Sequence, residues 1–343
     1  MTSSNNLLFH IQLSAPTNIA LIKYWGKKNG QFPLNPSVSM TLKNSVTKTS
    51  LQIYPRGEFF VEYLFEGKRS QDFERRVSKV LKKYCDKFNI LSQYSFFFQS
   101  ENSFPHSSGI ASSASSFASI AYAINSFLWE KNEKVVSKNF NHQASYLARL
   151  GSGSASRSIH CPFNIWGEFG DLSCDEWATP LSEVHANFQN MRDAIVVVSR
   201  EKKLISSSQG HALMNEHPYK EIRLKRSHQK CVNLLRVLKS GCWESFREIV
   251  EAEAFELHAL MMSSSPPFLL MKPETLKIIE KVKEIQKTGL QICLTMDAGA
   301  NLHLLYPAAS NDEVCNWIQT EIEDLSEVKE VIFDKMGEGV NIL

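Results

Sequence analysis

The chain has 343 residues, 43% of them hydrophobic, which is enough for one large or two medium domains with a substantial core. Its formal net charge of +2 gives no overall basic field, so the composition argues against a nucleic-acid partner. No apolar run approaches the length of a membrane span, and the N-terminus lacks the basic and apolar segments of a signal peptide. The seven cysteines show no CxxC spacing, so we expect reduced thiols in a cytoplasmic protein without a membrane partner.

Small turn-forming residues separate the elements expected in the first half of the chain. Pro55-Arg56-Gly57 lies between two β-rich runs, which predicts a hairpin of strands 48–54 and 58–65. The apolar periodicity of 70–89 predicts an amphipathic helix. The other elements expected here are strands at 7–14, 35–42 and 94–99 and helices at 117–129 and 134–149.

The second half alternates longer helical patterns with short apolar strands. A Ser-Ser-Ser-Pro-Pro break at 263–267 ends one helix before the next begins. The expected helices are 217–239, 243–262, 273–288 and 311–321, and the expected strands are 193–198, 291–296, 302–306 and 328–333. Because this order does not repeat a βαβ unit, the pattern indicates an α+β protein.

A loop of small residues at 105–116 runs directly into the apolar helix pattern. Its candidate ligand-binding residues are Ser107, Ser108, Gly109, Ser112 and Ser113. Glycine lets the main chain approach a bound group, and the N-terminus of a helix attracts anions. The stretch is therefore a candidate phosphate cradle, although an ordinary serine-rich N-cap turn would have the same composition.

Two further hydroxyl-rich loops carry positive charge. The segment 151–158 contains Ser152, Gly153, Ser154 and Arg157, and a guanidinium offers a fixed fork for carboxylate or phosphate. A flexible linker is the alternative interpretation, but the segment follows a helix directly and leads into apolar sequence. The third loop, at 202–210, contains Ser208.

Three charged residues stand at the ends of apolar runs. Lys23 and Lys27 follow the run that begins at residue 15, and Asp297 ends the strand 291–296 on a glycine turn. Alone, such lysines would be solvated and such an aspartate would be a turn former. With three hydroxyl-rich loops they suit phosphoryl transfer to a small anionic molecule. The chain has no Walker GxxxxGK[ST] pattern and no protein-kinase HRD/DFG set.

Five stretches in order resemble a known family. Pro105–Ala114 is similar to the phosphate loop of the GHMP kinase superfamily. Within that superfamily, the chain resembles the mevalonate diphosphate decarboxylase family at four stretches: Ala15–Lys27, Ser100–Pro105, Arg149–Ser158 and Met296–Asn301. The break at 263–267 also matches, so the likeness runs from about residue 11 to residue 306.

The resemblance implies a GHMP-kinase-like fold of two α+β lobes with the active site in the cleft between them. The N-terminal lobe would span 1–190, like domain 2 of ribosomal protein S5, and the C-terminal lobe 191–343. The implied enzyme is an ATP- and Mg²⁺-dependent carboxy-lyase that phosphorylates mevalonate 5-diphosphate on its 3-hydroxyl. Loss of phosphate and carbon dioxide then gives isopentenyl diphosphate for isoprenoid (lipid) biosynthesis. A homodimer is also implied, although no surface in the sequence identifies an interface.

The resemblance also implies roles for individual residues. Asp297 would take the proton of the 3-hydroxyl, Lys23 would balance charge on the transferred group, and Arg157 would hold the substrate carboxylate. The residues implied in substrate binding are Asn18, Tyr24, Lys27, Ser152, Gly153, Ser154 and Ser208. Those implied to cradle ATP and Mg²⁺ are Ser107, Ser108, Gly109, Ser112 and Ser113, with Ser112 the candidate protein ligand of the metal.

The sequence departs from the family pattern at four places, which leaves substrate choice open. Ala300 replaces a proline, which is expected to loosen the loop behind Asp297. Ser156 replaces a cysteine, Cys161-Pro162 a glycine pair and His211 a methionine. Three alternatives therefore stand beside the implied reaction: decarboxylation of mevalonate 5-phosphate, phosphorylation of the mevalonate 3-hydroxyl without decarboxylation, and ligand binding by an inactive relative. Lys27 and Tyr24 favour the diphosphate, and the presence of both Lys23 and Asp297 argues for a complete enzyme.

Overall fold

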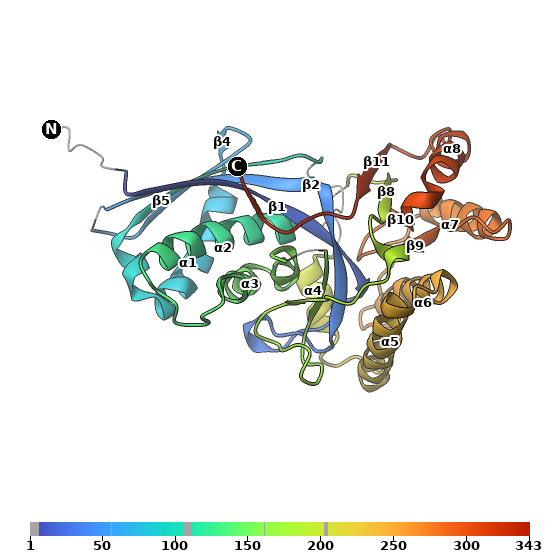
Figure 1. The fold of residues 1–343 in the computed structure, drawn as a ribbon, viewed down its shortest axis with the longest axis horizontal. Helices are drawn as coiled ribbons and strands as arrows, with labels where there is room; N and C mark the ends of the chain where they lie inside the picture. The colour runs from blue at the N-terminus through green and yellow to red at the C-terminus, as the bar shows by residue number, and fades with distance from the viewer. Residues whose placement is uncertain (1–6, 56, 106–111, 161, 202–204) are drawn as a thin grey trace.

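The computed structural model describes residues 7–55, 57–105, 112–160, 162–201 and 205–343, which form two β-sheets with helices packed on them (Figure 1). The strands of the first sheet, in chain order, are β1 (Phe9–Ile22), β2 (Ser37–Tyr54), β3 (Phe60–Phe65), β4 (Lys68–Arg69), β5 (Ser95–Asn102), β6 (Phe163–Trp166), β7 (Thr179–Pro180) and β12 (Asn341–Ile342). The strands of the second sheet are β8 (Arg192–Val197), β9 (Cys293–Thr295), β10 (Leu302–Tyr306) and β11 (Glu330–Lys335).

The helices divide between the two sheets. The α-helices are α1 (Gln71–Lys87), α2 (Ser112–Glu130), α3 (Phe140–Gly151), α4 (Ser207–Leu213), α5 (Lys220–Ser240), α6 (Trp243–Met262), α7 (Pro273–Gln286) and α8 (Asn311–Glu321). Short 3₁₀ turns are η1 (Asn29–Gln31), η2 (Asn89–Gln93), η3 (Gly153–Ser158), η4 (Ala186–Phe188) and η5 (Ala308–Ser310). No helix in the described ranges combines the length and apolarity needed to cross a membrane. This mixture of helices and sheets confirms the predicted α+β class.

Strand β1 changes character halfway along its length. Its first four residues alternate between partly buried and exposed positions, whereas its last eight, Ala15–Ile22, are all buried. Alternation is typical of a strand with one covered face, and a continuous apolar run is typical of a strand covered on both. The second half of β1 therefore lies between the two lobes, and the residues that follow Ile22 emerge at their junction.

The predicted hairpin of residues 48–54 and 58–65 is wrong. The strand order of the first sheet is β12-β1-β2-β5-β3-β4, so β5 lies between the two strands, antiparallel to β2 and parallel to β3. The physical reason is the apolar run Phe96-Phe97-Phe98, whose central position in the sheet buries the rings of Phe96 and Phe98.

Two helices begin at positions that differ from the periodicity-based boundaries. The helix expected at 134–149 begins only at Phe140, because the Asn139 side chain caps it by accepting a hydrogen bond from the His142 amide. Helix α2 is already helical at Ser112, five residues before the apolar pattern starts at Phe117. The small residues from Ser112 to Ser116, predicted as part of the phosphate-cradle loop, therefore belong to the helix.

One of the hydrophobic clusters contains residues from both lobes. The buried end of β1, with Ile19 and Ile22, packs in the same cluster as Ile195 of β8, Leu234 of α5 and Phe246 of α6. The chain also crosses between lobes at its end, because β12 returns from the second sheet to pair with β1. The lobes are therefore held by packing, and the cleft between them has a fixed base.

The Asp334 carboxylate forms hydrogen bonds between the second sheet and the first. Asp334 on β11 is buried and accepts main-chain hydrogen bonds from Lys43, Asn44 and Ser45 of β2, at donor–acceptor distances of 3.1, 2.8 and 2.7 Å. Bonds to a charged acceptor are stronger than bonds between neutral groups. This contact joins strand β11 of the second sheet to strand β2 of the first.

We expect Asp334→Asn to lower the free energy of unfolding by about 3 kcal/mol, because the new amide group would oppose a buried N–H donor. Urea denaturation of the full chain measures the change. Glu330→Gln on the same strand is the control: its ion pair with Arg200 is largely exposed, so its loss should cost less than about 1 kcal/mol. Equal effects of the two substitutions would contradict this account of the lobe junction.

Candidate active site

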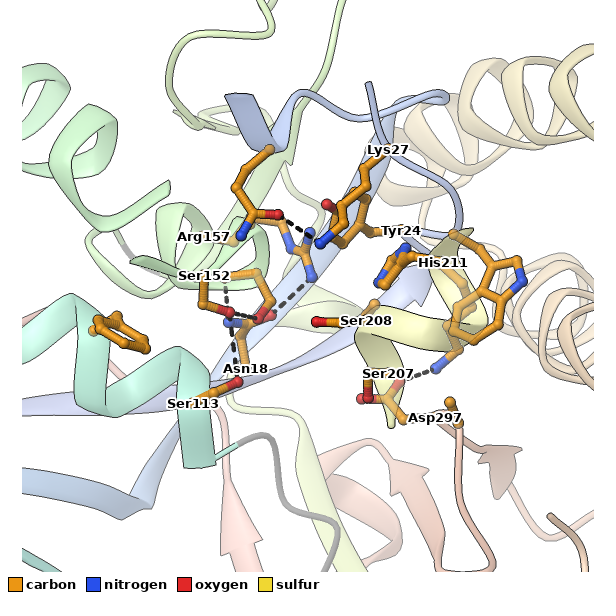
Figure 2. A pocket seen from close by; sticks show the side chains of 18 of the residues that line it. Asn18, Tyr24, Lys27, Ser113, Ser152, Arg157, Ser207, Ser208, His211 and Asp297 are labelled. Carbon is orange, nitrogen blue, oxygen red and sulfur yellow. Dashed lines mark hydrogen bonds and ion pairs between the residues drawn. The ribbon is translucent and has the colours of Figure 1, made fainter. Parts of the chain in front are cut away.

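A cavity of about 230 Å³ lies between the two lobes, with side chains from β1, α2, η3 and α4 around it (Figure 2). The sequence-predicted site residues that line it are Asn18, Lys23, Tyr24, Lys27, Ser113, Ser152, Gly153, Ser154, Arg157, Ser208 and Asp297. Ser112 begins α2 but does not line the cavity. Ser107, Ser108 and Gly109 lie outside the described residues, as does Cys161.

Lys23 and Asp297 form an ion pair inside the cavity. Lys23 follows the last residue of β1, and Asp297 follows β9, so the pair joins the two lobes. The Lys23 Nζ atom lies 2.9 Å from Oδ1 of Asp297; the lysine side chain is 2% exposed and the aspartate side chain 33% exposed. An ammonium at this distance favours the ionised form of the carboxylate. The arrangement thus presents a carboxylate base to the cavity with a buried cation beside it.

The loop that carries Asp297 is held by its neighbours. Asn301 accepts hydrogen bonds from the Val198 and Ser199 amides at 2.9 and 3.0 Å and donates back to the Ser199 carbonyl. The Thr275 hydroxyl donates to the Ala300 carbonyl at 2.7 Å. These bonds fix the loop at the position where Ala300 replaces the proline of the family pattern, so rigidity there comes from side-chain contacts with β8 and α7.

Arg157 is a buried cation without a direct counter-ion in the described part of the chain. Its Nε donates to the Ser39 hydroxyl at 3.1 Å and its Nη2 to Oδ1 of Asn18 at 3.3 Å. Among the described residues its Nη1 is buried and has no hydrogen-bond partner. Burial lowers the pKa of Arg157 to about 10, although Asp297 and Tyr24 oppose that shift. Because unpaired buried donors are costly, this group is suited to an anion that enters the cavity.

Tyr24 and Lys27 supply a second group of donors. The Tyr24 hydroxyl is buried, and no partner for it exists among the described residues. A Cβ atom on Gly153 would lie 2.7 Å from that hydroxyl, so only glycine permits this close approach. Lys27 donates to Oε1 of Gln31 at 3.0 Å, and partial burial together with Lys83 lowers its pKa. Both donors face the same cavity as Arg157.

Hydroxyl groups from α2 and η3 meet at another side of the cavity, where Figure 2 shows Ser113, Ser152 and Asn18 close together. The Oγ atoms of Ser113 and Ser152 are 3.4 Å apart, and those of Ser152 and Ser154 are 3.2 Å apart. Asn18 donates from Nδ2 to the Ser154 carbonyl and to the Ser158 hydroxyl, at 3.1 and 2.8 Å. Short donors beside the N-terminal turn of α2 suit phosphate oxygens.

His211 lines the cavity at the position where the family pattern has methionine. Its ring lies 4.3 Å from that of Tyr24 and 4.8 Å from that of Trp25, between centroids. The Gly26 amide donates to its Nδ1 at 2.9 Å, which fixes a neutral tautomer with the proton on Nε2. Burial, together with Lys27 and Arg157, lowers the pKa of His211 to about 3. The imidazole is therefore a neutral hydrogen-bond donor at neutral pH.

Several cavity residues were not among the sequence-predicted site residues. Arg76 of α1 and Gln31 of η1 line the cavity, as do Trp25 and Ser207. Arg76 sits on the polar face of an amphipathic helix, where arginine is ordinarily a solvated residue, so no local signal marked it. Trp25 and Ser207 lie inside stretches that the sequence did indicate, next to Tyr24 and Ser208.

Known proteins share this architecture. The diphosphomevalonate decarboxylase of Debaryomyces hansenii is 29% identical over 88% of this chain and 80% of its own length. That of Saccharomyces cerevisiae is 28% identical over 91% and 81%. The crystal structure of mevalonate diphosphate decarboxylase from Staphylococcus aureus matches with a TM-score of 0.85 and 26% identity, over 97% of this chain and 98% of that one. A solved complex of MDDEF with MVAPP, AMPPCP and magnesium matches with a TM-score of 0.84 and 25% identity, over the same shares.

The fold and the cleft together define a member of the GHMP kinase superfamily, which confirms the predicted two-lobed architecture. Two family models narrow the assignment: the diphosphomevalonate decarboxylase-like N-terminal domain matches residues 15–176, and the mevalonate 5-diphosphate decarboxylase C-terminal domain matches residues 194–342. The chain belongs to the mevalonate diphosphate decarboxylase family.

Burial of His211 makes stability depend on pH. Its folded pKa of about 3 lies below the unfolded value of about 6.5, so the unfolded chain takes up the proton first as the pH falls. The stability contributed by the neutral ring is complete above pH 6.5 and is lost progressively towards pH 3. When the pH is lowered from 7.5 to 5.0, we expect the free energy of unfolding to fall by about 2 kcal/mol more in the wild type than in His211→Met.

Denaturant titrations of both proteins at the two pH values measure this difference. The substitution removes one hydrogen bond to Gly26 at either pH, so only the change with pH is informative. An identical pH dependence in wild type and variant would contradict the assignment of a depressed pKa to His211.

Proposed function

We propose that the chain catalyses the ATP-dependent decarboxylation of mevalonate 5-diphosphate to isopentenyl diphosphate, with release of ADP, phosphate and carbon dioxide. The observation that carries the proposal is the unpaired buried Nη1 of Arg157 in the cavity that holds the Lys23–Asp297 pair. That cavity offers a carboxylate base, a cation beside it and a separate anion site. Decarboxylation requires that the substrate carboxylate be held in a fixed orientation, and the buried guanidinium suits that task.

The residues present fit ATP and magnesium. Ser113 projects from the first turn of a 19-residue helix into the cavity, and its hydroxyl lies beside those of Ser152 and Ser154. Hydroxyls and helix N-terminal amides are donors that phosphate oxygens accept. The solved complex of MDDEF with AMPPCP and magnesium supports the same cofactors here. When bound, ATP with Mg²⁺ supplies the phosphoryl group and neutralises its charge.

Asp297 and Lys23 act at the tertiary hydroxyl. Such a hydroxyl is a poor nucleophile, and the Asp297 carboxylate orients it and accepts its proton. The Lys23 ammonium, 2.9 Å from Oδ1, balances negative charge that develops beside the reacting oxygen. Burial strengthens this effect, because the Lys23 side chain is 2% exposed and little water screens it.

Arg157 and Asn18 hold the substrate carboxylate. Departure of phosphate leaves positive charge at the tertiary carbon, and expulsion of carbon dioxide quenches it, so the breaking carbon–carbon bond must be aligned. Nη1 of Arg157 is unpaired and Nη2 already contacts Asn18 at 3.3 Å, which gives a donor pair with fixed orientation. Alignment therefore comes from a side chain that is immobilised before the substrate arrives.

The remaining cations and hydroxyls hold the 5-diphosphate. Lys27 and Tyr24 lie on the cavity wall with Ser152, Gly153 and Ser154, and Ser208 faces them from α4. Arg76 adds positive charge at the same cavity. A group with more cations than one phosphate needs supports the diphosphate over the monophosphate as substrate.

The assignment extends to organisation and location. We propose lobes of residues 1–190 and 191–343, with β12 returning to the first lobe. A cytoplasmic location is supported by the free thiols of Cys85, Cys174, Cys231, Cys242, Cys293 and Cys315. The homodimer implied by the resemblance stays a prediction.

Parallel assays of ADP and carbon dioxide test the reaction. The protein is incubated with ATP, magnesium and one of mevalonate, its 5-phosphate or its 5-diphosphate. We expect equal amounts of ADP and carbon dioxide from the 5-diphosphate, and far less of either from the shorter compounds. ADP without carbon dioxide would identify a kinase, faster turnover of the 5-phosphate would identify the monophosphate enzyme, and no product from any compound would support a binding protein.

Asp297→Asn tests the base. Removal of a positioned general base slows proton transfer by about 100- to 10,000-fold, so kcat should fall by that factor while the affinity for mevalonate 5-diphosphate changes little. Calorimetric titration measures affinity, and the coupled assay measures kcat. A variant with near-normal turnover would remove Asp297 from the mechanism.

A further inference from the structure

Lys23 lies just beyond the end of a strand, where the sheet no longer supplies hydrogen-bond partners for its main-chain N–H and C=O groups. Strand β1 ends at Ile22, so the amide and carbonyl of Lys23 leave the hydrogen-bond ladder. The Lys23 amide donates to Oε1 of Glu253 at 3.0 Å. Its carbonyl accepts from Nη2 of Arg223 at 3.0 Å and from Nδ2 of Asn35 at 2.9 Å. The main-chain N–H and C=O groups of Lys23 are therefore each held by a side chain of the second lobe, and the C=O group is held by Asn35 of the first lobe as well.

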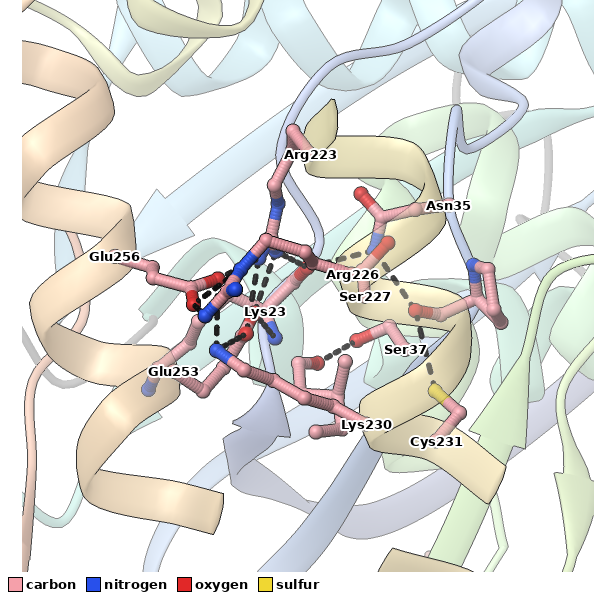
Figure 3. A network of polar contacts seen from close by, with 12 residues as sticks. Lys23, Asn35, Ser37, Arg223, Arg226, Ser227, Lys230, Cys231, Glu253 and Glu256 are labelled. Carbon is pink, nitrogen blue, oxygen red and sulfur yellow. Dashed lines mark hydrogen bonds and ion pairs between the residues drawn. The ribbon is translucent and has the colours of Figure 1, made fainter. Parts of the chain in front are cut away.

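The two second-lobe side chains that contact Lys23, Arg223 and Glu253, also bind each other (Figure 3). Arg223 on α5 donates from Nη1 to Oε2 of Glu253 on α6 at 2.9 Å, and their side chains are 1% and 0% exposed. Lys230 adds a contact of 3.0 Å to the same carboxylate. Burial alone would raise the pKa of Glu253, but Arg223 and Lys230 outweigh it and hold that pKa below its ordinary value. The pair is therefore charged when it contacts Lys23.

A buried ion pair is a poor device for stability alone. Desolvation of two charges offsets their attraction, and well-packed apolar residues of similar volume are often as stable. What the Arg223–Glu253 pair offers instead is geometry. The planar guanidinium and the carboxylate contact each other and, at the same time, the main-chain carbonyl and amide of Lys23, which belong to two successive peptide units. Lys23 is thus fixed both at its main chain and, through Asp297, at its Nζ atom.

We propose that Arg223 and Glu253 are positioning residues for the reaction, because they fix the main chain of Lys23 and thereby the place of its ammonium beside Asp297. The proposal rests on the decarboxylase function given above. Neither residue lines the cavity, so neither is a catalytic residue. Their effect on turnover passes through Lys23, where a displacement of 1 Å can cost about 100-fold in rate.

The same two helices carry a matched control. Arg226, on α5, donates from Nε to Oε1 of Glu256, on α6, at 2.8 Å, and its side chain is 58% exposed. That pair joins α5 to α6, and Glu256 also lies 3.8 Å from Nη1 of Arg223 and 2.7 Å from Nζ of Lys230, but within the described ranges neither Arg226 nor Glu256 has a hydrogen bond or ion pair with Lys23. Any general effect of replacing an arginine between these two helices by a lysine should therefore appear in Arg226→Lys, and an effect on Lys23 only in Arg223→Lys.

Arg223→Lys retains a charge for Glu253 but cannot supply the planar fork that reaches the Lys23 carbonyl as well. We expect kcat to fall about 10- to 100-fold, with KM for ATP and for mevalonate 5-diphosphate within about threefold of wild type. Arg226→Lys should leave all three constants unchanged. A merely structural role of Arg223 would lower the melting temperature without this separation of kcat from KM, and that result would overturn the proposal.

Amide hydrogen exchange supplies a readout that is independent of turnover. In a peptide that contains Lys23, exchange should be faster in Arg223→Lys than in wild type or Arg226→Lys, because the Glu253 acceptor is no longer held in place. If Arg223→Lys does not fold, Glu253→Gln makes the same comparison, since its amide opposes the donors of Arg223. Unchanged exchange at Lys23 in the folded variant would overturn the proposal. This readout does not require turnover, so it stays informative even if the wild-type protein lacks the proposed activity.

Discussion

The ion pair between Lys23 and Asp297 is the contact on which the site depends. Its two members come from different sheets and are 274 residues apart, yet their charged atoms lie 2.9 Å apart. A buried ammonium needs a counter-charge, and a carboxylate base needs a stable orientation. Asp297 supplies the counter-charge for Lys23, and Lys23 fixes the orientation of the Asp297 carboxylate. The ion pair therefore forms only if the two lobes keep their relative position. The core shared by β1, β8, α5 and α6 is what maintains that position.

Charge in the cavity is unbalanced in a way that selects the ligand. Lys23 has its partner in Asp297, whereas Arg157 and Lys27 have no carboxylate within ion-pair distance among the described residues. Burial lowers the pKa of Arg157 although Asp297 and Tyr24 oppose that shift, and burial with repulsion from Lys83 lowers the pKa of Lys27. Both shifts signal cations held at a cost in free energy. A multiply charged anion would relieve that cost, and the proposed substrate is such an anion because it carries a carboxylate and a diphosphate.

The sequence indicated most of the polar residues that gather around one cavity, but it gave a wrong strand pairing for the sheet. Lys23, Arg157 and Asp297 each lie in a short stretch whose composition suits its chemistry, and those stretches resemble the family in order. The hairpin at 55–57 failed because pairing is a tertiary property: the Phe96–Phe98 run enters the sheet between two strands that are neighbours in sequence. Local periodicity carries no information about such an insertion.

The support behind the site had no sequence signal at all. Arg223 and Glu253 lie on ordinary amphipathic helices, 200 and 230 residues from the lysine that they contact. His211 appeared only as a departure from a family pattern, and its role as acceptor for the Gly26 amide required the fold. Most of the polar residues that line the cavity lie in stretches with a recognisable local composition, whereas residues that contact other residues behind the cavity become apparent only in the folded structure.

A double-mutant cycle on kcat is the most direct measurement of the central claim, with Lys23→Met, Asp297→Asn and the double variant compared with wild type. If the two residues act as one unit, each single substitution should remove most of the rate, and the double variant should be no slower than the slower single variant. Losses that multiply in the double variant would show that the two side chains act independently, and would contradict the account.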